Sequence, residues 1–170
     1  MAHTDLIINM AGITFGYPQA PLVLNGLDFE LRRGEKIGLV GYNGSGKSTL
    51  LHVIMGLRRP QAGRLEILGR PITTARDFRE VRQRVGLLFQ DADDQLFSPT
   101  VLEDVSFGPL NQGKTAAEAE EIARQVLAEV GLAGFEERVT HKLSGGEKKL
   151  AALATVLAMR PEALLLDEPT

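Results

Sequence analysis

The feature that most constrains this chain is a glycine-rich turn between an apolar run and a stretch suited to a helix. It reads Gly41-Tyr42-Asn43-Gly44-Ser45-Gly46-Lys47-Ser48 and satisfies the pattern G-x-x-x-x-G-K-[ST] at every fixed position. Residues 36–40 (KIGLV) are predicted to form an apolar strand before the turn, and residues 47–56 a helix after it. This order predicts an α/β fold that binds phosphate.

The residue types in the turn suit a nucleotide phosphate group. Glycines allow successive backbone N–H groups to converge on phosphate oxygens, and Lys47 adds a positive charge for the β- and γ-phosphates. Ser48 offers a hydroxyl to Mg²⁺, while the absence of G-x-G-x-x-G excludes a dinucleotide fold at this position. The predicted phosphate and nucleotide contacts are Gly41, Asn43, Gly44, Ser45, Gly46, Lys47, Ser48 and Thr49.

Composition narrows the remaining classes. The 170 residues are 44% hydrophobic and 24% charged, which suits a folded domain with a core. The net charge of -3 disfavours nucleic-acid binding by bulk electrostatics, and the absence of cysteine excludes disulfides, thiolate zinc sites and a cysteine nucleophile. There is neither a signal-peptide pattern nor an apolar run long enough to span a membrane, so we expect a cytosolic protein.

Local patterns predict the order of the other elements. The predicted strands are 6–9, 12–17, 27–31, 63–68, 84–90 and 163–167. Capping boxes at Thr100, Thr115 and Ser144 predict three helix starts, and Gly131 is expected to end the second of these helices. A helical insertion near 91–143 is therefore expected within a strand and helix core.

Two acidic residues follow the last predicted strand. Asp167 suits a Mg²⁺ ligand or a ligand of its waters, and Glu168 suits activation of a water molecule. The alternative is that these acids simply face solvent, as they do at the ends of many strands. Their combination with the phosphate-binding turn favours the catalytic interpretation.

A third motif, Leu143-Ser144-Gly145-Gly146-Glu147, is either a plain capped helix start or an anion site made of bare backbone N–H groups. A capping box does not need two glycines, which weaken a helix. In order and type, these motifs resemble those of ABC-type ATPases. The resemblance implies that Ser144, Gly145, Gly146 and Glu147 form the signature that closes on ATP held by a partner subunit.

The same resemblance assigns further roles. It implies that Tyr17 stacks on adenine, although an ordinary edge-strand tyrosine is the alternative, and that Gln90 contacts Mg²⁺ and the attacking water. The cofactors would be ATP and Mg²⁺. The implied catalytic residues are Glu168, Gln90 and Lys47, and the implied Mg²⁺ contacts are Ser48, Gln90 and Asp167. Tyr42 and Leu150 depart from common family residues, with little expected effect on the anion sites.

Residues 90–100 (QDADDQLFSPT) resemble the corresponding segment in the ATPases of energy-coupling-factor transporters, and their sequence is most similar to the cobalt/nickel type. A solvated acidic loop is the alternative. The implied partners are a second ATPase in a head-to-tail dimer, a transmembrane coupling subunit and a substrate-binding membrane subunit, without nucleic acid. The implied location is the cytoplasmic face of the cell membrane, and the implied substrate is a transition-metal ion or a vitamin. A non-transport ABC ATPase and a non-catalytic nucleotide-binding fragment remain alternatives.

The predicted organisation is a partial ABC ATPase domain over 1–170. It comprises a nucleotide-binding core with a β-rich subdomain (1–90), a helical subdomain (91–143), and the signature helix with the acidic strand (144–170). In that family the chain continues after the acidic pair with a strand that lies centrally in the sheet. We therefore expect a fragment that, by itself, binds ATP poorly and hydrolyses it negligibly.

Overall fold

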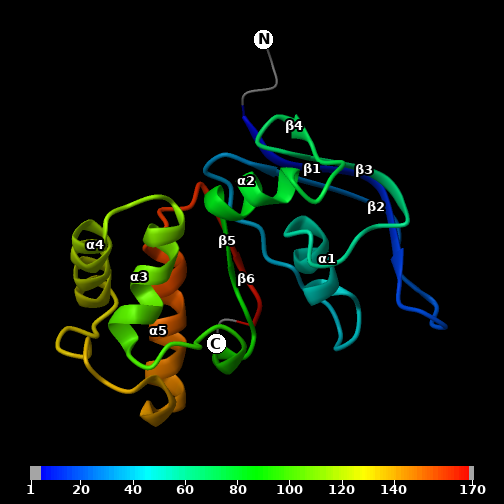
Figure 1. Cartoon of the computed structure of the whole chain (residues 1–170). Helices are drawn as coiled ribbons and strands as arrows, with labels where there is room; N and C mark the ends of the chain where they lie inside the picture. Colours follow the sequence, from blue (N-terminus) through cyan, green and yellow to red (C-terminus); the bar gives the residue numbers. More distant parts are fainter. Residues whose placement is uncertain (1–4, 169–170) are drawn as a thin grey trace. The chain divides into compact units, whose positions relative to one another are not determined.

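The computed structural model describes residues 5–168 and contains two compact units, one extending to Val85 and the other beginning at Gly86 (Figure 1). Both units contain helices, and the first contains a sheet of four strands. The predicted α/β class is therefore confirmed.

The sheet of the first unit consists of β1 (Leu6–Gly16), β2 (Leu22–Arg32), β3 (Ala62–Ile67) and β4 (Arg70–Pro71). Its strand order is β2-β1-β3-β4, and all neighbouring pairs are antiparallel. Two strands were predicted over residues 6–17, but the structure has one continuous strand, β1. The strand continues because a bulge at Gly12, whose φ is 64°, takes up the irregularity. The N–H of Gly12 donates to Asp28 Oδ1 at 2.7 Å, so the bulge keeps a hydrogen bond.

The first unit also contains two helices, α1 (Lys47–Ile54) and α2 (Asp77–Arg84). Helix α1 is slightly shorter than predicted. Helix α2 was not predicted, because only Val81 of this strongly charged helix is buried and the sequence therefore has no apolar periodicity there. The fully buried large side chains of this unit are Ile8, Met10, Ile13, Val53, Ile54, Ile67 and Val85.

Residues 36–40 form no strand, which contradicts the prediction. Ile37, Leu39 and Val40 are exposed, Val40 to 99%. A strand needs a neighbour to bond its backbone N–H and C=O groups, and no strand within residues 5–168 pairs with this segment. The apolar run therefore has the composition of a buried strand without the pairing that would make it one.

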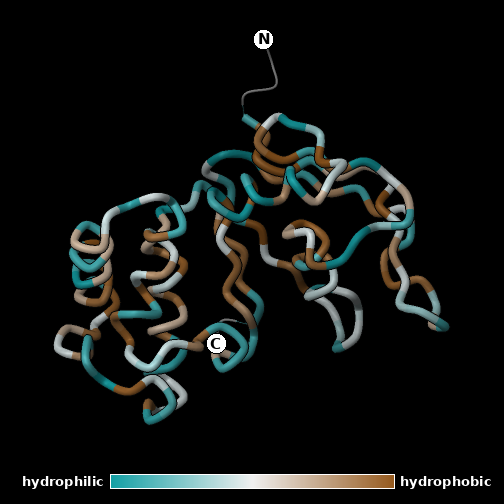
Figure 2. The backbone as a smooth tube through the Cα atoms, in the orientation of Figure 1, coloured by the Kyte–Doolittle hydropathy of each residue, from teal (hydrophilic) through white to brown (hydrophobic). Residues whose placement is uncertain are grey.

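The second unit, together with Val85, holds a two-stranded sheet of β5 (Val85–Leu88) and β6 (Ala163–Leu166). The strands run in the same direction in Figure 1, and Figure 2 shows them as largely hydrophobic segments. All four residues of β5 are buried, as the continuous apolar run predicted. The remaining elements are η1 (Ala92–Asp94), α3 (Val101–Asn111), α4 (Ala116–Glu129), η2 (Thr140–Lys142) and α5 (Gly145–Leu157).

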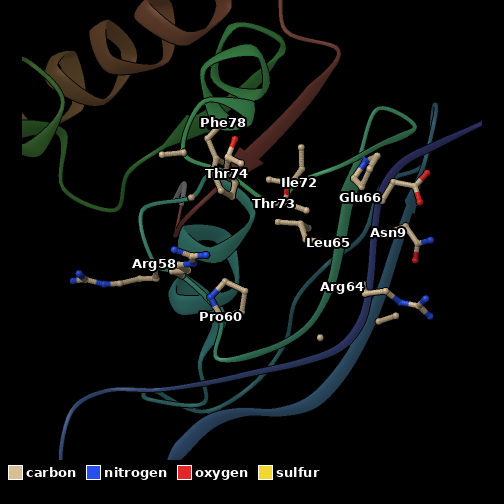
Figure 3. Close-up of a pocket in the computed structure, with 16 residues that line it drawn as sticks. Asn9, Arg58, Pro60, Arg64, Leu65, Glu66, Ile72, Thr73, Thr74 and Phe78 are labelled. Atoms are coloured by element: carbon tan, nitrogen blue, oxygen red, sulfur yellow. The ribbon is translucent and has the colours of Figure 1, made fainter.

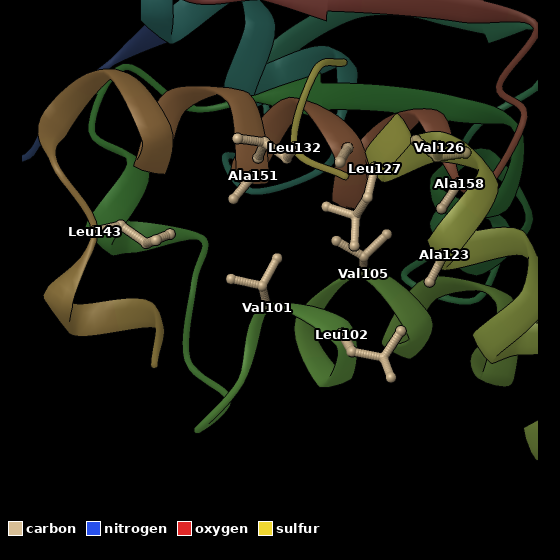
Figure 4. Close-up of a cluster of buried hydrophobic side chains, with 11 residues drawn as sticks. Val101, Leu102, Val105, Ala123, Val126, Leu127, Leu132, Leu143, Ala151 and Ala158 are labelled. Carbon is tan, nitrogen blue, oxygen red and sulfur yellow. The ribbon is translucent and has the colours of Figure 1, made fainter. Parts of the chain in front are cut away.

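Helices α3, α4 and α5 each begin with the predicted capping box, at Thr100, Thr115 and Ser144 respectively. Their apolar side chains point toward one another and form a single core (Figure 4). Helix α5 therefore shares its core with the helices of the expected 91–143 insertion. The buried members of this core are Val101, Leu102, Val105, Ala123, Val126, Leu127, Leu132, Leu143, Ala151, Ala154 and Ala158.

We expect Gly63→Ala to destabilise the first unit by about 3 kcal/mol, because the new methyl group would overlap a neighbouring backbone. A Cβ at Gly63 would lie 2.6 Å from the carbonyl oxygen of Gly12, and the φ of Gly63 is +100°. Gly69→Ala is the matched control, since Gly69 also has a positive φ but nothing lies within 4 Å of its Cβ. The measurement is the urea midpoint of unfolding. Equal shifts for the two variants would contradict the steric argument.

Candidate functional site

The glycine-rich turn leads directly into α1 in the first unit. Gly46 is the residue before the helix and has a φ of 95°, a conformation that glycine adopts without strain. A Cβ at Gly46 would lie 2.8 Å from Val23 Cγ1, and one at Gly41 would lie 2.7 Å from Ser45 Oγ. The local conformation and packing therefore require glycine at Gly46, whereas a methyl group at Gly41 would meet the side chain of Ser45, whose hydroxyl can rotate away.

The side chain of Lys47 folds back over this turn. Its Nζ donates to the carbonyl oxygens of Gly41 and Tyr42, at 3.0 and 3.1 Å. An ammonium group has three donors, so a third remains for another acceptor. Ser48 is half-buried beside it, and Thr49 is buried. A fixed cation, a hydroxyl and a helix N-terminus at one turn fit a nucleotide phosphate with its Mg²⁺.

Tyr17, the predicted adenine contact, lies beside the same helix. Its hydroxyl is 3.2 Å from Thr49 Oγ1, and its ring meets Phe15 edge to face at 5.1 Å between ring centroids. The guanidinium carbon of Arg58 lies 5.7 Å from the centroid of the Tyr17 ring. Arg58 could not be predicted from the sequence, because a single arginine in a turn has no distinguishing pattern.

The predicted acidic pair lies at the end of β6 in the second unit. The N–H of Asp167 donates to the carbonyl oxygen of Leu88 at 3.0 Å, which holds the ends of β5 and β6 together. Asp167 is only 6% exposed, whereas Glu168 is exposed. Gln90 Nε2 donates to Glu168 Oε2 at 2.8 Å, although these residues are 78 positions apart. The structure thus brings together two residues that were both predicted to belong to the site.

The backbone of Glu168 is strained. Its φ is 46°, a left-handed conformation that costs a non-glycine residue about 1 kcal/mol. Strain of this kind is found preferentially at functional sites, where the surrounding structure maintains it. Here the N–H of Asp167, the preceding residue, is bonded to β5, and the side chain of Glu168 is bonded to Gln90. These two hydrogen bonds hold the strained residue in place.

The third motif begins α5. Ser144 Oγ accepts the N–H of Glu147 at 3.4 Å, and Glu147 Oε2 accepts the N–H of Ser144 at 2.7 Å. Gly145 and Gly146 are the first two residues of the helix, and nothing lies within 4 Å of a Cβ built on either. The packing within this chain therefore does not require glycine at these positions.

The pKa of Glu147 is lowered from its ordinary value, chiefly because its carboxylate accepts the backbone N–H of Ser144. The hydroxyl of Ser144 and the charge of Arg138, 3.3 Å away, act in the same direction. A lowered folded-state pKa means that the carboxylate stabilises the helix start at neutral pH. This stabilisation is lost as the pH falls through the lowered pKa.

Gln90 and Gly145 line the same hollow of the second unit, which has a volume of about 540 Å³. Its other lining residues are Asp91, Ala92, Asp93, Leu143, Lys148 and Lys149. Residues from the end of β5 and from the start of α5 therefore face a common solvent-filled space.

A larger hollow, of about 700 Å³, lies in the first unit (Figure 3). Its apolar part includes Leu65, Ile72 and Phe78. None of the predicted site residues lines it, so hollow size alone would have pointed away from the phosphate-binding turn.

No group of three or more histidine, cysteine, aspartate or glutamate side chains within residues 5–168 could hold a metal ion. No helix in this range is long and apolar enough to cross a membrane.

The comparisons with known proteins agree on one family. The sequence profile described as "ABC transporter" matches residues 24–170. A protein of Nitratidesulfovibrio vulgaris, named as a candidate ABC transporter ATP-binding protein, is 53% identical over 166 residues, which are 96% of this chain and 60% of that protein. The energy-coupling factor transporter ATP-binding protein EcfA of Methanocaldococcus jannaschii is 47% identical over 165 residues, 96% of this chain and 59% of that protein.

Solved structures show the same relationship. Chain cbiO1 of Clostridium perfringens, part of the ABC transporter complex cbiONQ, has a TM-score of 0.83 and 35% identity, over 96% of this chain and 65% of that one. The ATP-binding cassette MJ0796, in a dimeric structure bound to ADP and Pi, has a TM-score of 0.86 and 25% identity, over 96% and 74% of the two chains.

The profile match covers most of the chain, and the first relatives are matched over nearly all of it. The chain spans about 60% of the length of those relatives. The phosphate-binding turn, the signature and the acidic pair all lie within the matched residues. The chain belongs to the ABC transporter family of ATP-binding proteins.

Proposed function

We propose that the full-length protein is an ATP-hydrolysing subunit that energises a transporter. The observation that carries the proposal is the Gln90–Glu168 hydrogen bond at the end of β5 and β6. It joins a glutamine and a carboxylate that the family resemblance assigns to the same hydrolytic step, in a chain with an intact phosphate-binding turn. The resemblance to MJ0796, whose dimer holds ADP and Pi, supports ATP as the substrate.

Each site residue has a role in this proposal. The turn from Gly41 to Ser48, with Thr49, holds the phosphates, and Lys47 places its charge on the β- and γ-phosphates. Mg²⁺, held by Ser48, Gln90 and Asp167, would neutralise developing phosphoryl charge. Glu168 accepts the proton of the attacking water, and Gln90 orients that water. Tyr17 supports the adenine.

The signature serves the nucleotide of a second copy or a similar subunit. Ser144, Gly145, Gly146 and Glu147 form a capped helix start with bare N–H groups and open space around both glycines. A helix N-terminus of this kind favours an anion, and the phosphates of the chain's own nucleotide are assigned to the turn at 41–48. The MJ0796 structure is dimeric, which supports pairing of two such subunits, and the proposed arrangement is head-to-tail.

We expect Gly145→Ala and Gly146→Ala to lower ATP turnover by about tenfold or more without destabilising the protein. Alanine fits the open space and favours a helix by up to about 1 kcal/mol over glycine, but its methyl group hinders the approach of a phosphate. The measurement pairs steady-state hydrolysis with thermal melting of the full-length variants. A fall in melting temperature that accompanies the loss of turnover would contradict this assignment.

The proposal also extends to the transported substrate and the membrane partners. The relative EcfA is named for an energy-coupling factor transporter, and cbiO1 is part of the complex cbiONQ. These names, with residues 90–100, support an energy-coupling-factor ATPase. Its partners would be a transmembrane coupling subunit and a substrate-binding membrane subunit at the cytoplasmic face of the membrane. The substrate would be cobalt, nickel or a vitamin.

Purification of the tagged full-length protein from its own membranes tests this function. We expect co-purification of two membrane proteins, and ATP-dependent uptake of Co²⁺, Ni²⁺ or a vitamin by vesicles that contain the complex. ATPase activity with ribosomes or DNA as the co-purifying material would instead identify a non-transport ABC ATPase. The absence of ATPase activity in the full-length protein would favour a non-catalytic nucleotide-binding protein.

A further inference from the structure

A second glutamine, Gln95, connects the end of β5 to the middle of α5. Its Oε1 accepts the backbone N–H of Phe89 at 3.2 Å. Its Nε2 donates to the carbonyl oxygen of Ala152 and to Thr155 Oγ1, both at 2.7 Å. The neighbouring N–H and C=O groups fix the orientation of the carboxamide, since only its oxygen can accept from Phe89 and only its nitrogen can donate to Ala152.

The hydrogen bond from Gln95 to β5 lies next to Gln90 in the chain. Phe89 immediately precedes it, and the carbonyl of Leu88, one residue earlier, accepts the N–H of Asp167. The end of β5 is therefore bonded on one side to the acidic strand and on the other, through Gln95, to the signature helix. Gln90 is the first residue beyond these two bonds, and its side chain reaches Glu168.

The intervening residues reinforce the connection. Ala92 is buried with Leu88 and Ala152 in a small cluster, against which Leu96 and Leu153 pack. Lys148 Nζ lies 2.6 Å from Asp93 Oδ1, and the Lys148 side chain is only 19% exposed. Residues 91–95 thus contact α5 at Lys148, Ala152 and Thr155, which lie on one side of the helix at spacings of three and four.

We infer that Gln95 is a positioning residue for ATP hydrolysis. Its hydrogen bonds set the position of Gln90 relative to the helix that begins with Ser144, Gly145 and Gly146. Thr155 is its partner on the helix. A shift of α5 against β5 has to break up to three hydrogen bonds of one carboxamide or carry the end of β5 with it. This inference rests on the proposed ATPase function, and it adds a residue to which no role has been assigned.

The central experiment compares Gln95→Met with Gln90→Ala and with the double variant in the full-length protein. Methionine keeps the length and volume of the side chain but makes none of the three bonds. We expect the kcat for ATP to fall about tenfold in Gln95→Met, with ATP affinity within about twofold of the unchanged protein. In the Gln90→Ala background, Gln95→Met is expected to have no further effect on kcat beyond about twofold.

Matched variants separate positioning from general weakening. Gln125→Met removes an exposed glutamine of α4 that bonds Glu121 at 2.8 Å, and is expected to leave kcat unchanged. Thr155→Val is expected to lower kcat, as Gln95→Met does. Thr155→Ser keeps the hydroxyl and is expected to have the kcat of the unchanged protein. A merely structural role would not produce this rescue together with a dependence on Gln90.

Amide hydrogen exchange at Phe89 provides a readout that does not depend on turnover. We expect exchange at this N–H to accelerate about tenfold in Gln95→Met and to remain unchanged in Gln125→Met. An unaltered kcat in Gln95→Met, or an equal loss in the presence and absence of Gln90, would overturn the inference. An inactive wild-type protein would overturn the proposed function and the role of Gln95 in turnover, while exchange would still decide whether Gln95 holds the end of β5.

Discussion

Replacing Glu168 by glutamine in the full-length protein is expected to lower ATP turnover by about 10²–10⁴-fold. The amide keeps the size of the side chain and can still accept the hydrogen bond from Gln90 Nε2, which is 2.8 Å long in the unchanged chain. It cannot accept a proton from the attacking water. The substitution therefore removes the proposed chemistry while retaining the local contact.

The same variant is expected to accumulate as an ATP-bound dimer, because in the proposed cycle ATP binding would close two subunits and hydrolysis would reopen them. Size-exclusion chromatography with light scattering, in the presence of ATP and Mg²⁺, measures this. Glu137→Gln serves as a control, since it removes a carboxylate from the same unit outside the proposed site. A variant that stays monomeric at saturating ATP, or keeps more than about a tenth of its turnover, would count against Glu168 as the proton acceptor.

Lys47→Ala is expected to weaken ATP binding by about 100-fold or more. The ammonium group is held over the turn by the carbonyls of Gly41 and Tyr42, so alanine removes both the order of the turn and the charge proposed for the phosphates. Charge-assisted hydrogen bonds contribute about 1.5–3 kcal/mol each, and each 1.4 kcal/mol corresponds to about tenfold in affinity.

The measurement for Lys47 is titration calorimetry of the full-length protein with ATP and Mg²⁺. Lys114→Ala is the matched control, because Lys114 is an exposed lysine of the other unit. Arginine at position 47 is not expected to rescue binding, since its planar group is wider than the compact ammonium that fits between two carbonyls. Binding by Lys47→Ala within about threefold of the unchanged protein would overturn the role of this lysine.

Much of the local structure could be predicted from the sequence. The three capping boxes, the start of α1 after the glycine-rich turn and the buried strand β5 follow from patterns of a few neighbouring residues. Such patterns act over one helical turn or one strand, so they survive whatever the rest of the chain does. The strand predicted at residues 36–40 was wrong because a strand depends on a distant pairing partner, and α2 was missed because its charged sequence has no apolar periodicity.

The sequence by itself therefore determined which residues cap helices and form the acidic pair, and it predicted which would bind phosphate, because those properties belong to residue types at short spacings. Only the tertiary structure decided that Gln90 meets Glu168, that Gln95 bonds Phe89 and α5 together, and that Gly145 and Gly146 face open space. These contacts join residues far apart in the chain. Their geometry depends on how strands pair and helices pack, which no short pattern encodes.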